Sequence, residues 1–159
     1  MKVSLPYGKK SVDIDLNGIN ATVLEPKFVE GVAEEKAGFM AACEAPIGSA
    51  PLKDLISSED KVAILIPDAT RPFPSDRVLP WLFEALPHVS KDQIVIINGT
   101  GSHRGNTPGE LIGMVGQEVY DTYRIINHDA HDPSTLAYAG KSEFGYDVYQ
   151  NREFVEADK

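Results

Sequence analysis

Three short apolar runs, separated by segments of helical character, constrain the fold of this chain most. The runs are Lys61–Ile66, Ile94–Ile97 and Tyr123–Ile126, and the last is the weakest. They do not alternate with polar residues and are rich in β-branched side chains, which is typical of strands buried on both faces. Strands that alternate with helices form parallel sheets with right-handed crossovers. The sequence therefore predicts an α/β fold: a mostly parallel, Rossmann-like sheet flanked by helices in three layers.

Two of the intervening segments carry helix start signals. Ser75 or Asp76 could be the N-cap of a helix after the first run, because either side chain can accept a hydrogen bond from a free backbone N–H group. After the second run, Thr107 and Glu110 have the spacing of a capping box, and Pro108 lies at the first helical position. Both signals support the predicted alternation of strands and helices.

The N-terminal part of the chain has a different pattern. Ser11–Leu16 alternates polar and apolar residues, the period of a strand with one buried face. Asn17–Gly18 is a common two-residue hairpin turn, and Ile19–Leu24 could be the returning strand. We therefore expect an N-terminal β-hairpin, followed by a helix over about Val29–Cys43 and a short helix over Leu52–Ile56.

Composition limits the partners of the chain. Its 159 residues suit one domain, and its net charge of −9 argues against a nucleic-acid surface, which needs a basic face. No apolar run reaches the roughly 20 residues of a membrane span, and the first residues lack the apolar core of a signal peptide. We expect a cytoplasmic protein without nucleic-acid or membrane partners. The single cysteine, Cys43, excludes an intrachain disulfide and is interpreted as a packed side chain.

Each apolar run ends in a cluster of polar residues. The clusters are Pro67–Pro72, Asn98–Arg104 and Asn127–Asp132. Parallel strands place their carboxyl ends at one edge of the sheet, where α/β proteins bind their ligands. The sequence therefore predicts that the three clusters form one site.

The first cluster combines an acid, a hydroxyl and a guanidinium in Asp68, Thr70 and Arg71. Arginine suits a carboxylate ligand because its planar fork donates two parallel hydrogen bonds. Asp68 could accept hydrogen bonds from sugar hydroxyls or orient Arg71. The alternative is an ordinary surface turn with a local Asp–Arg pair.

The second cluster is a glycine-containing loop, Gly99–Ser102, that leads to His103. Its backbone N–H groups could bind an anion, but its spacing matches neither the dinucleotide-binding nor the Walker pattern. His103 is a candidate general acid or base, because imidazole titrates near neutral pH. A hydrogen-bonded structural histidine is the alternative.

The third cluster contains His128, Asp129, His131 and Asp132, which resemble metal ligands. The His-x-x-His spacing is loose and a third ligand is not obvious, so we favour a structural loop that braces the edge of the sheet. A mononuclear metal hydrolase site built on His103, His128 and His131 is the less favoured alternative.

Taken together, these motifs resemble the lactate racemase family. The resemblance covers nearly the whole chain, in order, and rests on Leu5–Gly8, Asp68–Pro72, Gly99–Arg104, Asn127–Asp129 and Val148–Arg152. It implies an enzyme of two α/β domains with the active site between them. It also implies a nickel pincer nucleotide, a pyridinium mononucleotide with two sulfur-bearing arms. Hydride would leave the α-carbon of a small 2-hydroxy acid and return on either face, while histidines take and return the hydroxyl proton.

The resemblance also assigns roles to individual residues. By motif position, Arg71 is similar to the arginine that binds the substrate carboxylate, and His103 is similar to one of two acid/base histidines. Asp68 and Thr70 match positions near the cofactor or substrate, and Thr100 is a further candidate cofactor contact.

Other residues of the family pattern have no counterpart in this sequence. The cofactor-bearing lysine, the nickel-ligand histidine and the second acid/base histidine are expected after Lys159. We therefore expect residues 1–159 to be the N-terminal domain of a longer racemase or epimerase, partnered by its C-terminal domain. This domain alone should be inactive and should hold no metal or cofactor tightly. The competing hypothesis is a non-catalytic α/β domain that binds a nucleotide or a small carboxylate.

Overall fold

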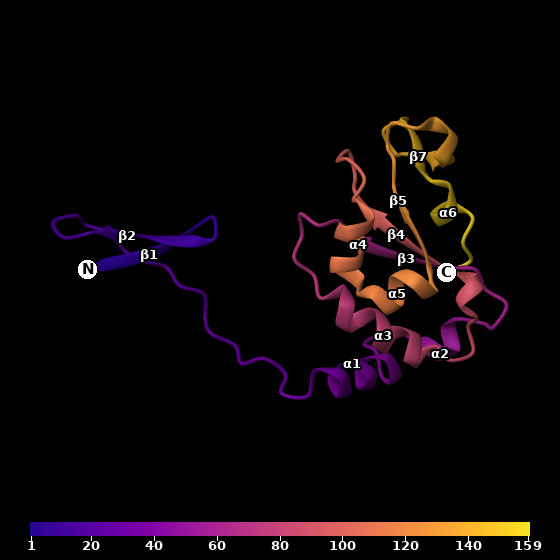
Figure 1. Cartoon of the computed structure of the whole chain (residues 1–159), viewed down its shortest axis with the longest axis horizontal. Helices are drawn as coiled ribbons and strands as arrows, with labels where there is room; N and C mark the ends of the chain where they lie inside the picture. Colours follow the sequence, from indigo (N-terminus) through magenta and orange to yellow (C-terminus); the bar gives the residue numbers. More distant parts are fainter. The chain divides into compact units, whose positions relative to one another are not determined.

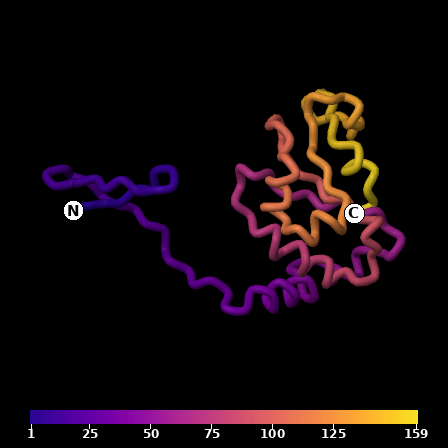
Figure 2. The backbone as a smooth tube through the Cα atoms, viewed as in Figure 1, coloured from indigo at the N-terminus to yellow at the C-terminus, as the bar shows by residue number.

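A computed structural model describes all residues, 1–159, and divides the chain into two compact units (Figures 1 and 2). The first unit is Met1–Ala33 and the second is Glu34–Lys159. None of the helices is both long and apolar enough to cross a membrane. The candidate site residues all belong to the second unit, which is described first.

The second unit is built on a parallel sheet of three strands. These are β3 (Val62–Pro67), β4 (Ile94–Gly99) and β5 (Arg124–Asn127), in the order β3-β4-β5. Both pairings are parallel. The prediction of three neighbouring strands that point the same way is confirmed. The central strand β4 is the most deeply buried, because it has a strand on each side.

Helices flank this sheet, as the α/β pattern predicts (Figure 1). Their bounds are α1 (Glu35–Glu44), α2 (Leu52–Leu55), α3 (Ser75–Ala85), α4 (Pro108–Val115) and α5 (Gln117–Thr122). Short 3₁₀ turns precede β4 at Lys91–Gln93 and follow β5 at Pro133–Thr135.

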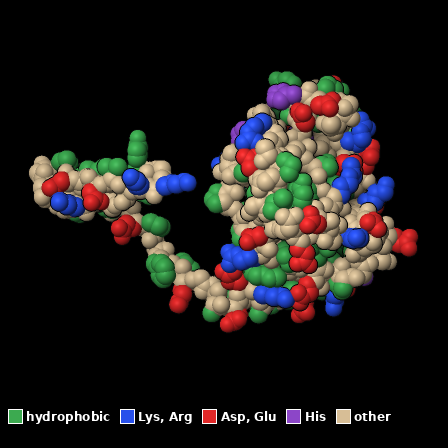
Figure 3. All heavy atoms as spheres, viewed as in Figure 1, with side chains coloured by type: hydrophobic (Ala, Val, Ile, Leu, Met, Phe, Trp, Pro, Cys, Tyr) green, Lys and Arg blue, Asp and Glu red, His purple; other side chains and the backbone are tan.

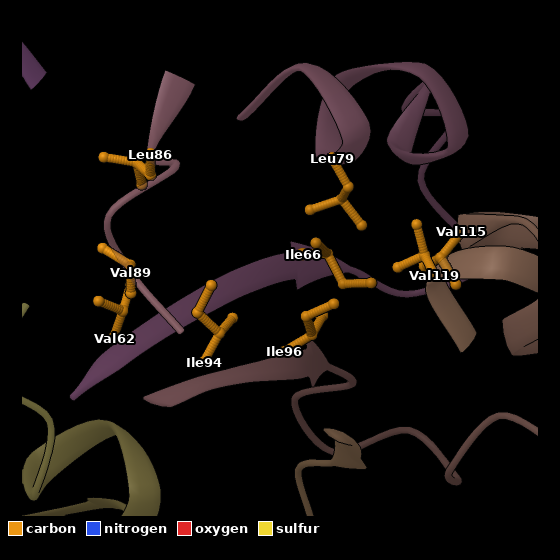
Figure 4. Packing of buried hydrophobic residues seen from close by; sticks show 9 residues of the cluster. All are labelled: Val62, Ile66, Leu79, Leu86, Val89, Ile94, Ile96, Val115 and Val119. Carbon is orange, nitrogen blue, oxygen red and sulfur yellow. The ribbon is translucent and has the colours of Figure 1, made fainter. Parts of the chain in front are cut away.

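One face of the sheet and the nearby helices form the core (Figure 4). Alternate side chains of β3 and β4 point to this face, because successive residues of a strand point to opposite sides. They pack against side chains of α3, α4 and α5 and of the segment after α3. The buried cluster consists of Val62, Ile66, Leu79, Leu86, Val89, Ile94, Ile96, Val115 and Val119. On the opposite face Leu65 remains 59% exposed.

A second hairpin follows β5. It consists of β6 (Leu136–Lys141) and β7 (Asp147–Asn151), which pair antiparallel with a bulge in β6, and α6 (Arg152–Val155) follows. The sequence pattern predicts no strands over these residues. After α6 the backbone of the last residues bonds to Lys61 and Ala63 beside β3, so the end of the chain lies next to the start of that strand.

The N-terminal unit contains the predicted hairpin, but its strands differ from those expected. Strand β1 (Lys2–Tyr7) pairs antiparallel with β2 (Lys10–Asp15), and the turn contains Gly8 at φ +59°. A turn is present at Asn17–Gly18, as predicted, but no strand returns over Ile19–Leu24, so that part of the prediction is wrong. The observed register places apolar residues opposite one another on one face of the hairpin. The alternation that indicated a strand was correct, but it did not identify the partner.

Two helix starts also differ from the prediction. Helix α3 begins at Ser75, its N-cap is Pro74, and no side chain caps it. The predicted caps by Ser75 or Asp76 are therefore wrong, and Ser75 is instead buried within the first turn. Helix α1 begins at Glu35, later than the predicted Val29, after an irregular segment. The short helix predicted over Leu52–Ile56 is present.

The capping box of α4 is confirmed. The hydroxyl of Thr107 accepts a hydrogen bond from the backbone N–H of Glu110 at 3.3 Å, and the carboxylate of Glu110 accepts from the N–H of Thr107 at 2.8 Å. Pro108 follows at the first helical position. Two backbone donors that the helix cannot satisfy itself thereby gain partners.

Removing this cap should destabilise the chain measurably. Thr107→Ala should lower the free energy of unfolding by about 1 kcal/mol, because an alanine N-cap leaves the N–H of Glu110 without an acceptor. Thr107→Ser keeps the hydroxyl and should retain most of the stability. Urea unfolding measures both variants, with Thr122→Ala at the exposed end of α5 as the matched control. Equal stabilities for Thr107→Ala and the control would contradict the role of the cap.

Candidate active site

The three polar clusters lie at one edge of the sheet, as predicted. Pro67 and Gly99 are paired at the carboxyl ends of β3 and β4, and Asn98 is paired with Asn127 at the end of β5. The loops that follow the strands therefore begin side by side. Figure 3 shows histidine side chains exposed at the end of the second unit that carries these loops.

The central feature of this edge is a bond between Asp68 and His103. The Nδ1 atom of His103 lies 2.7 Å from Oδ2 of Asp68. The carboxylate of Asp68 is only 7% exposed, whereas the imidazole of His103 is 57% exposed. A buried acid thus bonds to a histidine whose other side faces solvent.

Asp68 is held as an anion. The Thr70 hydroxyl donates to its Oδ1 atom at 2.6 Å, and the Thr70 N–H donates to the same atom at 3.2 Å. The hydrogen bond from Thr70 lowers the pKa of the Asp68 carboxyl most, the bond from His103 lowers it further, and burial only partly opposes them. Each of these donors stabilises the charged form.

The charge on Asp68 determines which nitrogen of His103 carries hydrogen. An ionised carboxylate only accepts hydrogen bonds, so Nδ1 must be the donor in this pair. In the neutral imidazole the Nε2 atom then carries a free lone pair and can take a proton. A histidine oriented by a buried carboxylate is well suited to general acid–base chemistry.

Sequence reasoning missed this pair. It placed Asp68 near Arg71 or a sugar hydroxyl, whereas the structure shows the Asp68 carboxylate bonded to Thr70 and His103. The local Asp–Arg pair of the alternative interpretation is not among the ion pairs of the chain. A signal was available: an acid directly after one strand and a histidine shortly after the next become neighbours when the strands are parallel.

Arg71 has an exposed side chain without an anionic partner. The chain has five arginines. Four of them form ion pairs with glutamates, namely Arg77, Arg104, Arg124 and Arg152. The Arg71 guanidinium forms none, and its backbone N–H donates to the carbonyl of Asp68 at 3.0 Å. The structure therefore leaves this guanidinium available to an external carboxylate.

A cleft of about 530 Å³ lies between the loops after β4 and β5. His103 contributes to its wall. The full lining is Ser102, His103, Arg104, Gly105, Asn127, His128, Asp129 and His131. Arg71 does not line it, and its connection to His103 runs through Asp68. The expectation that Arg71 and His103 serve one ligand thus stays a prediction.

Thr100 lies beneath this edge. Its side chain is 2% exposed, and its hydroxyl donates to the backbone carbonyl of His128. The N–H of His128 in turn donates to the carbonyl of Asn98 at 3.0 Å. Thr100 therefore joins the ends of β4 and β5, and its hydroxyl is already engaged inside the chain.

The loop after β5 is held by local bonds of its acidic residues. Asp129 accepts from the N–H of His131 at 2.8 Å, and Asp132 accepts from the N–H and hydroxyl of Ser134 at 2.9 and 2.7 Å. No three His, Cys, Asp or Glu residues of the chain are grouped so that they could hold a metal ion. These local bonds support the interpretation of this cluster as a structural loop, which stays a prediction.

Three comparisons with known proteins point to the same family. The family model for the lactate racemase N-terminal domain matches residues 7–159. The chain is similar to a lactate racemase of Thermoanaerobacterium thermosaccharolyticum, with 28% identity over 98% of this chain and 38% of that protein. It is also similar to the solved structure of the lactate racemase apoprotein from that organism, with a TM-score of 0.81 and 28% identity over 99% of this chain and 37% of that one. The chain thus spans well under half the length of these relatives.

The low pKa of Asp68 predicts a pH-dependent contribution to stability. Its pKa is lower in the folded than in the unfolded chain, so between these values the unfolded chain binds more protons. The contribution is complete above the ordinary aspartate value of about 4 and is lost as pH falls through the lower folded value. Asp68→Asn should therefore be less stable than the wild type at neutral pH, and the difference should narrow in acid.

Urea unfolding between about pH 2 and pH 7 measures this difference. Asp92→Asn is the control, because the Asp92 carboxylate is exposed and forms no hydrogen bond or ion pair in the chain. It reports the effect of removing one negative charge. A gap between wild type and Asp68→Asn that stays constant down to the acid limit would contradict the ionised, bonded state of Asp68.

Proposed function

Because the chain belongs to the lactate racemase N-terminal domain family, we propose that it supplies the substrate-binding and proton-transfer residues of a 2-hydroxy-acid racemase or epimerase. The Asp68–His103 pair is the observation that carries this proposal. It provides an oriented base, His103, at the carboxyl edge of the sheet, and the Asp68 member of the pair lies on the same strand-end segment as Arg71, which has no anionic partner. A base and a carboxylate-binding group are the two functions that a 2-hydroxy acid requires.

Arg71 would bind the carboxylate of the substrate. A guanidinium can donate two parallel hydrogen bonds to the two oxygens of a carboxylate, which fixes the position and the orientation of a small acid. The backbone N–H of Arg71 bonds to the carbonyl of Asp68, which keeps the Arg71 backbone close to the acid/base pair. The α-hydroxyl is adjacent to the carboxylate in such a substrate and would thus be placed toward His103.

His103 would exchange the proton of that hydroxyl. Its Nε2 atom would take the proton when the carbon bearing the hydroxyl is oxidised to a carbonyl, and would return it when the carbonyl is reduced again. The negative charge of Asp68 would stabilise the imidazolium that exists between these steps, and the bond to Nδ1 would hold the ring in position.

The proposal includes a nickel pincer nucleotide, which when bound would supply the acceptor for hydride from the α-carbon. The residues present fit the substrate side of such a site. Thr70 is exposed next to Asp68 and could contact the cofactor or the substrate, whereas Asp68 fits less well, because it is buried and its carboxylate is bonded to Thr70 and His103. Thr100 fits less well as a contact, because its buried hydroxyl bonds to His128.

We propose that the remaining parts of the active site belong to polypeptide outside residues 1–159. These parts are the lysine that carries the cofactor, the nickel-ligand histidine and the second acid/base histidine. The extent of the similarity supports this division, because the chain covers 38% of the racemase that it resembles. Residues 1–159 alone should then be inactive.

Replacing His103 tests the proposed reaction. In the full-length protein loaded with its cofactor, His103→Ala should reduce kcat for the interconversion of D- and L-lactate about 10²- to 10⁴-fold, as expected for loss of a general acid–base group. His88→Ala is the control, because His88 is exposed and bonds to the backbone of Ile56, away from the strand-end loops. Full activity of His103→Ala would leave the non-catalytic binding domain as the better interpretation.

Replacing Arg71 tests substrate binding. Arg71→Lys keeps the positive charge but removes the two-pronged donor, so kcat/KM for the hydroxy acid should fall about 10- to 100-fold, the equivalent of one hydrogen bond to a charged group. Arg77→Lys, at the ion pair with Glu35 between α3 and α1, is the control for the same substitution. Unchanged kcat/KM in Arg71→Lys would exclude Arg71 as the carboxylate-binding residue.

A further inference from the structure

Asn98 is a buried polar residue that the proposed chemistry does not use. It is fully buried at the end of β4. Its Nδ2 atom donates two hydrogen bonds, to Oδ1 of Asn106 at 2.8 Å and to Oδ1 of Asn127 at 2.7 Å. Buried amides cost stability unless their bonds are satisfied, and the Oδ1 atom of Asn98 has no partner. Such a residue calls for an explanation other than packing.

Asn127, at the end of β5, both accepts a hydrogen bond from the backbone of Asn106 and donates one to it. Its Oδ1 atom accepts from the Asn106 N–H at 3.0 Å, and its Nδ2 atom donates to the Asn106 carbonyl at 3.0 Å. Backbone groups cannot exchange roles, so these two bonds fix the orientation of the Asn127 amide. The atom of Asn98 that faces Asn127 must then be the donor, which requires an amide and not a carboxylate at position 98.

Asn106 extends the set to β3 and α4. Its Oδ1 atom accepts from the N–H of Ala69, next to Asp68, at 3.4 Å, and its Nδ2 atom donates to Glu110 at 3.1 Å. The pKa of the Glu110 carboxyl lies far below its usual range, chiefly because of the Arg104 guanidinium and then the Thr107 N–H and the Asn106 amide. Asn106 therefore bonds to all three strand ends and to the helix.

These bonds lie at both ends of one exposed loop. Asn98 is the last residue but one of β4 before the loop, Asn106 lies at the end of the loop, and His103 lies within it. The loop also contains Gly101 at φ +59°. Glycine has a flexible backbone, so without the bonds at its ends the loop could move. Apart from these bonds, the loop is held by the Thr100 hydroxyl on the carbonyl of His128, by the Asp68–His103 bond and by the two bonds from Arg104 to Glu110 at 2.7 and 2.9 Å.

We propose that Asn98, Asn106 and Asn127 form a positioning network that holds the loop so that His103 stays on Asp68. The hydrogen bonds of the network all lie within the chain, and it acts through His103, although Asn127 also borders the cleft beside His103. Its consequences for catalysis rest on the proposed function, whereas its effect on the histidine ring does not.

Gly105 provides an independent way to disturb the network. A Cβ atom at this position would lie 3.1 Å from both Cγ and Nδ2 of Asn127. Gly105→Ala would therefore displace the Asn127 amide without removing any hydrogen-bonding group. Asn127→Asp does the reverse: it keeps the shape and the accepting oxygen but removes the donor to the Asn106 carbonyl.

The decisive measurement is NMR of the His103 ring nitrogens in ¹⁵N-labelled residues 1–159. In alkaline solution the wild type should show the distinct Nδ1 and Nε2 signals of one fixed tautomer, because Asp68 selects the Nδ1–H form. In Asn127→Asp and Gly105→Ala the two signals should move toward each other, as in a freely exchanging imidazole. Asn151→Asp is the matched control, since Asn151 is also buried and its Oδ1 caps α6, a role that aspartate retains.

The experiment distinguishes an effect on the position of the His103 ring from a loss of folding and from a failure of the proposed function. Amide spectra establish that each variant is folded; should Asn127→Asp unfold, Gly105→Ala decides, because it changes only an exposed loop residue. Unchanged His103 signals in the folded variants would overturn the proposal. In full-length enzyme the same variants should lower kcat on the order of 10- to 100-fold, the effect of a small misplacement, with little change in KM. If wild-type enzyme shows no racemase activity, the proposed function fails while the ring signals still test the network.

Discussion

Strand β4 lies between β3 and β5 and is buried from Ile94 to Asn98, and this parallel pairing is the constraint on which the rest of the second unit depends. Parallel neighbours require crossover segments, and the crossovers here are the helices that complete the core against one face of the sheet. The same geometry brings three loops that are distant in the sequence to one edge. A reactive residue on any of these loops therefore has neighbours from the other two.

Burial of β4 also places polar side chains out of contact with water at that edge. Its last residues include Asn98, and Thr100 follows at once, yet both side chains are almost inaccessible to water. Unpaired, such groups would cost the chain stability; the Asn98 Nδ2 atom and the Thr100 hydroxyl are each bonded to an adjacent loop, whereas Asn98 Oδ1 has no partner. Asn98 bonds to Asn106 and Asn127, and Thr100 bonds to the carbonyl of His128. The need to satisfy buried polar groups thus gives the exposed loops defined positions on a rigid sheet.

The electrostatics of the site follow from this arrangement. The chain carries a net charge of −9, and most of its arginines are neutralised by glutamates. Arg71 is the exception, and the acid closest to it along the chain, Asp68, is bonded to Thr70 and His103 instead. Asp68 therefore orients the histidine and leaves the guanidinium free. The bonds of this one buried carboxylate thus leave both a solvent-facing histidine and an unpaired guanidinium near the edge of the sheet, an arrangement that fits the proposed chemistry on a hydroxy acid.

The sequence by itself determined the elements whose signals are local. Unalternating β-branched runs identified the three parallel strands, Thr107 and Glu110 identified the start of α4, and polar residues after each strand identified the edge that carries the candidate site. The tertiary structure decided whatever depends on which segments meet. Alternation in Ser11–Leu16 indicated a strand but not its partner, because register and pairing depend on the surfaces that the strands bury together. For the same reason only the structure joined Asp68 to His103 and Asn98 to Asn127, since a hydrogen bond between distant residues depends on distances that the folded backbone alone fixes.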